Sequence, residues 1–142
     1  MSFKNILCPI DFSDDMDKII KLAINQCHED GTILFFNQIN TIGYEKDDNN
    51  FEKDTELIKS RQIDLECLLM KFKSRHPSIH FHYELCYDID ISKEICTLAK
   101  EQHIDLIVMG SHGRSGLNKF FMGNLAIDVL EVVSCPLLIV KL

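Results

Sequence analysis

The chain has 142 residues, 46% of them hydrophobic, so it is the length of one domain and can bury a full core. Its formal net charge of −7 argues against nucleic acid and anionic lipid as partners, because both require clustered Lys and Arg. No apolar run approaches the roughly 20 residues of a transmembrane helix, and the first residues lack the apolar segment of a signal peptide. We therefore expect one cytoplasmic domain over residues 1–142, with no nucleic-acid and no membrane partner.

Apolar runs of strand length alternate with helical patterns along the chain. In chain order we expect strand 3–10, helix 16–27, strand 32–39, helix 51–74, strand 79–86, helix 91–99, strand 104–109, helix 125–133 and strand 136–141. Ser13 is the expected N-cap of the first helix, because its hydroxyl can accept a bond from an exposed backbone N–H. Residues 40–50 are polar and irregular, which predicts a surface loop.

This alternation predicts an α/β fold, a single five-stranded parallel sheet with helices on both faces and right-handed crossovers. Strand order 3-2-1-4-5 would place the switch point between the first and fourth strands. Ligands in such Rossmann-like sheets bind there, outside the carboxyl ends of the strands. Residues 9–13 and the segment after the fourth strand would then face each other across a crevice.

The segment after the fourth strand is rich in glycine. It runs Gly-Ser-His-Gly-Arg-Ser-Gly over residues 110–116, and Gly123-Asn124 follows at the start of an apolar helix. Glycine lets backbone N–H groups approach a ligand, and a helix N-terminus adds unpaired donors and partial positive charge. The spacing matches neither the dinucleotide fingerprint nor a Walker A loop. We interpret it as a different phosphate loop, the alternative being ordinary turn glycines.

Three side chains beside this crevice have binding chemistry. Asp11 can accept hydrogen bonds from ribose hydroxyls, although it can equally cap a turn or the first helix. His112 is placed for a phosphate or ribose contact, and Asn124 can cap its helix or donate an amide N–H to an anion. No nucleophile with a base and an orienting partner is recognisable, which argues against an enzyme.

Other residues with metal or redox chemistry are weaker candidates. The six cysteines contain no Cys-x-x-Cys pair and lie in apolar patterns, so we expect reduced, mostly buried thiols. His80 and His82 share one face of a strand, but without a nearby third ligand solvated histidines are the default. Asp88 and Lys141 suggest the alternative of a receiver-type domain that is phosphorylated on an aspartate. Such a domain would need an acidic pair after the first strand.

Four segments resemble the universal stress protein family, and together they span nearly the whole chain. They are residues 5–13, 105–116, 122–124 and 135–140. ATP-binding members carry glycine, two residues, glycine, nine residues, glycine and then a small hydroxyl residue. Gly110, Gly113 and Gly123 keep that spacing. The resemblance implies a fold like that of the adenine nucleotide alpha hydrolases.

The resemblance also implies a regulatory protein of the stress response that binds ATP or AMP, with Mg²⁺ or Mn²⁺ accompanying ATP. Asp11 would meet the ribose, and the glycine segment would wrap the phosphates. The implied nucleotide-binding residues are Pro9, Ile10, Asp11, Gln38, Met109, Gly110, Ser111, His112, Gly113, Arg114, Ser115, Gly116, Gly123, Asn124 and Leu125. Enzymatic activity would be at most slow ATP hydrolysis.

Two of these positions depart from the family pattern. Asn124 stands where the family prefers Ser or Thr; it keeps a donor and an acceptor but is bulkier. Gln38 stands where nucleotide-binding members place an apolar residue against adenine. Its amide could hydrogen-bond the edge of the base or could spoil the apolar pocket.

The last strand predicts a homodimer. Residues from Pro136 to Leu142 are mostly apolar and would form the sheet edge, where unpaired backbone groups favour pairing with another strand. A two-fold partner can cover that edge with the same strand. The alternative function is therefore a dimeric interaction module of the same fold that does not bind nucleotide.

Overall fold

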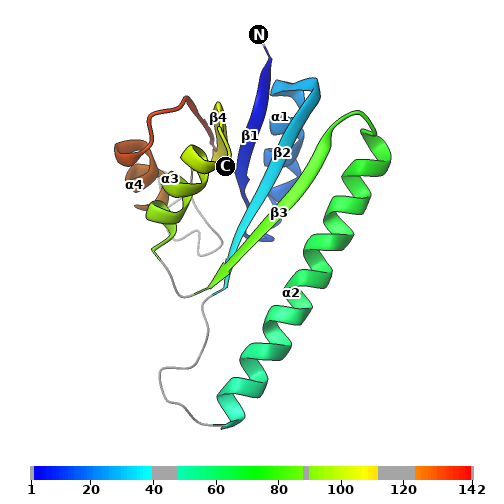
Figure 1. Cartoon of the computed structure of the whole chain (residues 1–142), viewed down its shortest axis with the longest axis vertical. Helices are drawn as coiled ribbons and strands as arrows, with labels where there is room; N and C mark the ends of the chain where they lie inside the picture. The colour runs from blue at the N-terminus through cyan, green and yellow to red at the C-terminus, as the bar shows by residue number, and fades with distance from the viewer. Residues whose placement is uncertain (1, 40–47, 88–89, 112–123, 142) are drawn as a thin grey trace.

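A computed structural model describes residues 2–39, 48–87, 90–111 and 124–141, without the side chains of residues 48–53 and 124. Strands and helices alternate along the chain (Figure 1). The elements are β1 (Phe3–Pro9), α1 (Met16–Gln26), β2 (Cys27–Ile39), α2 (Asp48–Arg75), β3 (His80–Tyr87), α3 (Ile91–Glu101), β4 (Leu106–Gly110), α4 (Asn124–Val132) and β5 (Leu137–Val140). No helix in the described ranges is long and apolar enough to cross a membrane.

The five strands form one sheet in the order β3-β2-β1-β4-β5, and every neighbouring pair is parallel. This confirms the predicted topology, with β1 and β4 adjacent at the point where the strand order reverses. β3 and β5 form the two edges.

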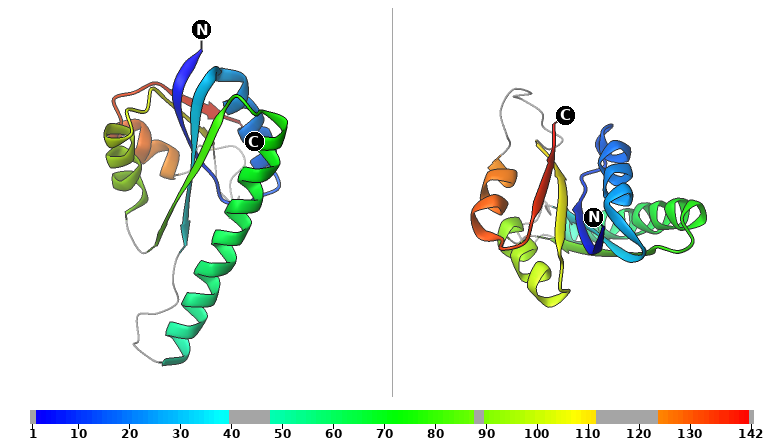
Figure 2. Two further views of the ribbon diagram at one scale, coloured as in Figure 1. Left: turned by 45° about the vertical axis from the view of Figure 1, so that its right-hand side comes forward. Right: turned by 90° about the horizontal axis from the view of Figure 1, so that it is seen from above.

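Two hydrophobic cores lie on opposite faces of the sheet, because alternate strand residues point to opposite sides. Ile6 and Cys8 of β1 belong to the core shared with α1 and α2, whereas Leu7 belongs to the core shared with α3 and α4. The view from above shows α1 and α2 on one side of the sheet and α3 and α4 on the other (Figure 2). The expectation of helices on both faces is therefore confirmed.

The boundary between α1 and β2 differs from the sequence expectation. The helix ends at Gln26, and β2 begins at Cys27, five residues before the predicted start at residue 32. The backbone of Cys27 pairs with Phe3, and the register then shifts so that Asn5 pairs with Thr32. The apolar side chain of Cys27 continued the helical spacing, which concealed the start of the strand.

The start of α1 also differs. Its N-cap is Asp15, whose side chain makes no capping bond, so the prediction of Ser13 as N-cap was wrong. The Ser13 carbonyl instead accepts from the backbone N–H of Met16 at 3.1 Å. Ser13 thus belongs to the turn between β1 and the helix.

All six cysteines are free, in agreement with the expectation of reduced thiols, but they are less buried than expected. Only Cys8 is fully buried, Cys67 on α2 is exposed, and the other four are half-buried. Burial raises the pKa of the Cys8 thiol to about 12. Burial also raises the pKa of Cys27 to about 11, with a smaller contribution from the carboxylate of Asp105.

Candidate functional site

The crevice expected from the strand order would lie between β1 and β4, at the carboxyl end of the sheet. The ladder between these two strands ends at Leu7 and Ile107. Beyond it, Pro9 pairs with β2, whereas Gly110 pairs with β5. The two strand ends therefore turn toward opposite halves of the sheet, as the predicted switch point requires.

Backbone hydrogen bonds hold both walls of this crevice. The N–H of Ile10 donates to the carbonyl of Phe36 at 2.8 Å, and the N–H of Ser111 donates to the carbonyl of Val140 at 2.8 Å. The first bond extends the pairing of β1 with β2 by one residue, and the second extends the pairing of β4 with β5 by one residue. As a result, Ile10 belongs to the half of the sheet that contains β2, with Asp11 directly after it, whereas Gly110 and Ser111 belong to the half that contains β5.

Asp11 lies in a tight turn on the β1 wall. Its Oδ1 accepts from the backbone N–H of Ser13 at 3.0 Å, so the structural role considered from the sequence, closing a turn, is present. Phe12, the next residue, has a φ of 58°, a left-handed conformation that is uncommon outside glycine. The turn therefore places a half-buried carboxylate just beyond the carboxyl end of β1, on a strained backbone.

A polar network that sequence reasoning missed lies beneath this turn. Asn37 is 2% exposed, and its Nδ2 donates to the carbonyl of Ile10 at 2.8 Å. Its Oδ1 accepts from Nη1 of Arg61 on α2 at 2.8 Å. The Arg61 guanidinium also lies 5.1 Å from the centre of the Phe12 ring. A polar residue inside the apolar run of β2 was the available signal for Asn37, and no pattern pointed to Arg61.

Two of the predicted nucleotide-binding residues lie on the sheet face that α3 and α4 cover. Met109 is 4% exposed and belongs to the core of that face. Gln38 is half-buried in β2, its Oε1 is buried, and strand alternation points it to the same side. These two side chains therefore lie on one face of the sheet, on β2 and β4, the strands on either side of β1.

The glycine-rich segment is described only at its two ends. Gly110 is the last residue of β4 and Ser111 follows it, both half-buried, and the segment leads into α4, which begins at Asn124. Leu125 packs against the core of the α3–α4 face. The remaining predicted residues, His112, Gly113, Arg114, Ser115, Gly116 and Gly123, lie outside the described residues.

Among the residues that the structure describes, the weaker sequence candidates form no second site. His80 and His82 are both exposed, and the described part of the chain holds no group of three or more metal-ligating side chains. Asp88 lies outside the described residues. Lys141 is exposed, and its carbonyl accepts from Nζ of Lys18 at 3.5 Å.

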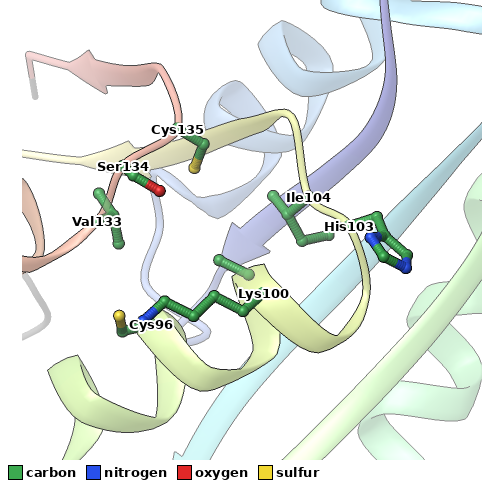
Figure 3. A pocket seen from close by; sticks show the side chains of 8 residues that line it. Cys96, Lys100, His103, Ile104, Val133, Ser134 and Cys135 are labelled. Carbon is green, nitrogen blue, oxygen red and sulfur yellow. The ribbon is translucent and has the colours of Figure 1, made fainter.

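A pocket of about 170 Å³ lies at the other end of the sheet, before β4 and β5 begin. Figure 3 shows it between the end of α3 and the segment that joins α4 to β5. Burial raises the pKa of the Cys135 thiol there, with smaller contributions from Asp105 and Cys96, which favours the protonated thiol. The pocket is lined by Cys96, Ala99, Lys100, His103, Ile104, Val133, Ser134 and Cys135.

Comparison with known proteins identifies the family. The model of the universal stress protein family matches residues 2–141, so the chain belongs to this family. The universal stress protein MJ0531 of Methanocaldococcus jannaschii is 28% identical over 142 residues, covering 98% of this chain and 82% of that protein. YxiE of Bacillus subtilis is 44% identical over 48 residues, which cover 34% of this chain and 32% of YxiE.

Solved structures share the fold at low sequence identity. The structure of MJ0577 superimposes with a TM-score of 0.86 at 21% identity, covering 100% of this chain and 98% of that one. A universal stress protein from Archaeoglobus fulgidus in complex with dAMP gives 0.63 at 16% identity, covering 99% and 100%. A universal stress protein in complex with cAMP gives 0.56 at 16% identity, covering 99% and 98%.

Proposed function

We propose that this chain is a regulatory protein of the stress response that binds ATP or AMP in the crevice between β1 and β4. The observation that carries this proposal is the divergence of the two strand ends, which leaves Asp11 on one wall and Gly110 and Ser111 on the other. The relatives that bind dAMP and cAMP support an adenine nucleotide as the ligand.

The proposed nucleotide lies along the crevice. Its ribose hydroxyls donate to the Asp11 carboxylate, and its base lies toward Gln38 and Met109. The phosphates lie against the glycine-rich segment and the N-terminus of α4, where backbone donors favour an anion. Mg²⁺ or Mn²⁺ would accompany ATP at its phosphates.

Small molecules released from the denatured, freshly purified protein give the first test. Mass spectrometry should detect AMP or ATP, and calorimetry on nucleotide-free protein should show binding heat. A chain that carries no nucleotide and gives neither heat nor thermal stabilisation with any adenine nucleotide would refute the proposal. The dimeric module without nucleotide would then be the better description.

A pair of isosteric variants tests the position of the site. Asp11→Asn should weaken AMP binding about tenfold, because hydrogen bonds to a charged acceptor are stronger than those to an amide. Asp105→Asn is the matched control, since Asp105 also accepts backbone bonds, from Lys4 at 3.0 Å and Asn5 at 2.9 Å, but at the amino end of the sheet. Equal effects of the two changes would place the nucleotide elsewhere.

A homodimer through β5 is the second part of the proposal. β5 forms a sheet edge, and Leu137, Leu138 and Ile139 are each only half-buried. The adjacent helix α4 exposes further apolar side chains, including 53% of Leu130 and 47% of Val132. An apolar edge beside an apolar helix face favours coverage by a second copy.

A further inference from the structure

The turn that carries Asp11 is held from both sides by one residue of α2. On the side before Asp11, Arg61 donates to Asn37 at 2.8 Å, and Asn37 donates to the Ile10 carbonyl at 2.8 Å. On the side after Asp11, the Arg61 guanidinium lies 5.1 Å from the centre of the Phe12 ring. Both chain neighbours of Asp11 are thereby tied to the same guanidinium.

This tie acts where the backbone is strained. Phe12 has a φ of 58°, and a non-glycine residue keeps such a conformation only when its surroundings hold it there. The bond between Asp11 Oδ1 and the Ser13 N–H is local and would accompany the turn if the turn moved. Asn37 and Arg61, in contrast, connect the turn to β2 and α2, which belong to the packed body of the protein.

We propose that Arg61 is a positioning residue that fixes the Asp11 carboxylate for contact with the ribose of the bound nucleotide. This inference rests on the proposed function. A planar guanidinium suits the role, because it donates to Asn37 in its plane and faces an aromatic ring at the same time. Without it, Phe12 can relax toward ordinary backbone angles and carry the Asp11 carboxylate out of register with the ribose hydroxyls.

The test uses ribose discrimination, because a general loss of stability does not alter it. Dissociation constants for AMP and 2′,3′-dideoxy-AMP are measured on the nucleotide-free, full-length protein. The original chain should prefer AMP by about tenfold, the order expected for hydrogen bonds to a charged acceptor. Arg61→Met keeps the aliphatic stem but loses the guanidinium, and it should reduce that preference to about twofold or less.

Lys71→Met is the matched control on the same helix. Like Arg61, Lys71 bonds a side-chain oxygen, here Oδ2 of Asp17 at 3.3 Å, and lies near an aromatic ring, 5.2 Å from the centre of Phe72, but neither contact involves the Asp11 turn. The Lys71→Met variant should prefer AMP to the same extent as the original chain. Arg61→Lys keeps the charge and should give an intermediate preference, and it decides the question if Arg61→Met fails to fold.

The possible outcomes separate the two proposals. An original chain that binds neither nucleotide refutes the proposed function. If the original chain binds AMP and 2′,3′-dideoxy-AMP equally well, Asp11 does not contact the ribose, and the inference about Arg61 fails as well. A tenfold preference that survives in the folded Arg61 variants overturns the inference alone and leaves the nucleotide site standing.

Discussion

At the residue scale, Asn37 connects three parts of the structure through one buried amide. It receives a charge-assisted bond from Arg61 and supplies the partner of the Ile10 carbonyl. Asn37→Leu leaves that carbonyl and the guanidinium without these partners, so the free energy of unfolding should fall by about 1–3 kcal/mol. Urea denaturation measures the change.

A double-mutant cycle shows whether this loss belongs to the network. Arg61→Met should cost less in the Asn37→Leu background than in the original chain, because the bond between the two side chains is already lost. Equal costs in both backgrounds would mean that the two residues act independently.

Asp90 gives a prediction about pH. It caps α3, and its Oδ1 accepts from Oγ of Ser92 at 2.8 Å and from the backbone N–H of Lys93 at 3.3 Å. These bonds hold the pKa of Asp90 below its usual value, the Ser92 bond most strongly. The capping contribution should therefore be present at neutral pH and disappear as the pH falls through the lowered pKa of the folded state.

The measurement compares melting temperatures of the original chain and Asp90→Ala across pH. The variant should melt lower at pH 7, and the difference should shrink between about pH 5 and about pH 2. Asp128→Ala, a change at an exposed carboxylate within α4, is the control. A difference for Asp90→Ala that is constant over this range would contradict the assignment.

At the scale of elements, the start of β2 depends on a glycine. A Cβ at Gly31 would lie 2.8 Å from the Lys4 carbonyl oxygen and 2.9 Å from the His28 carbonyl oxygen. It would also lie 2.6 Å from Sγ of Cys27. Gly31→Ala should therefore destabilise the protein by about 1–3 kcal/mol in urea denaturation, because two of the three atoms are backbone and cannot rotate away.

Removing the third atom provides the control. Cys27→Ala deletes the sulfur, so in the Gly31→Ala background it should recover only part of the lost stability. Complete recovery would mean that the Cys27 side chain, rather than the backbone of β1 and β2, excludes a methyl group at position 31.

The same elements show how far the sequence could be interpreted. Mostly apolar runs such as Ile104–Met109 predicted the strands, because burial on both faces leaves few polar positions. The start of β2 at Cys27 was missed, since pairing with Phe3 is a tertiary contact that no local spacing reveals. Leu130 lies within the predicted apolar helix 125–133, yet it is 53% exposed.

The candidate site was predictable only in part, because only some of its residues follow from the pattern of strands. Asp11 and Gly110 follow strand ends, and the topology of a parallel sheet brings such ends together. Arg61 is distant in sequence from both, and its role depends on how α2 packs over the turn. In the sequence, Arg61 resembles any solvent-facing cation of an amphipathic helix, and nothing indicates its contacts with Asn37 and Phe12.

At the scale of the whole molecule, the geometry of β5 makes the proposed dimer testable. Pro136 and Val140 accept bonds from β4, so alternation along the strand directs the backbone N–H of Ile139 away from the sheet. Ile139→Pro removes that outward donor without removing a bond to β4. It should convert a dimer to monomer or aggregate in light scattering at tens of micromolar.

The original chain sets the reference for this experiment. A monomer at the same concentration would refute the dimer. A dimer that persists in Ile139→Pro would move the interface away from the edge of β5, and the exposed apolar residues of α4 would be the next surface to change.

The uneven burial of the six thiols has a practical consequence for following α2. Cys67 is exposed, whereas burial raises the pKa of Cys8 to about 12 and of Cys86 to about 11. At neutral pH a maleimide dye or a nitroxide should attach to Cys67 before the buried thiols. Cys67 lies less than two helical turns from Arg61. The native chain therefore carries its own labelling position on the helix that anchors the Asp11 turn, and spectroscopy can follow that helix without an introduced cysteine.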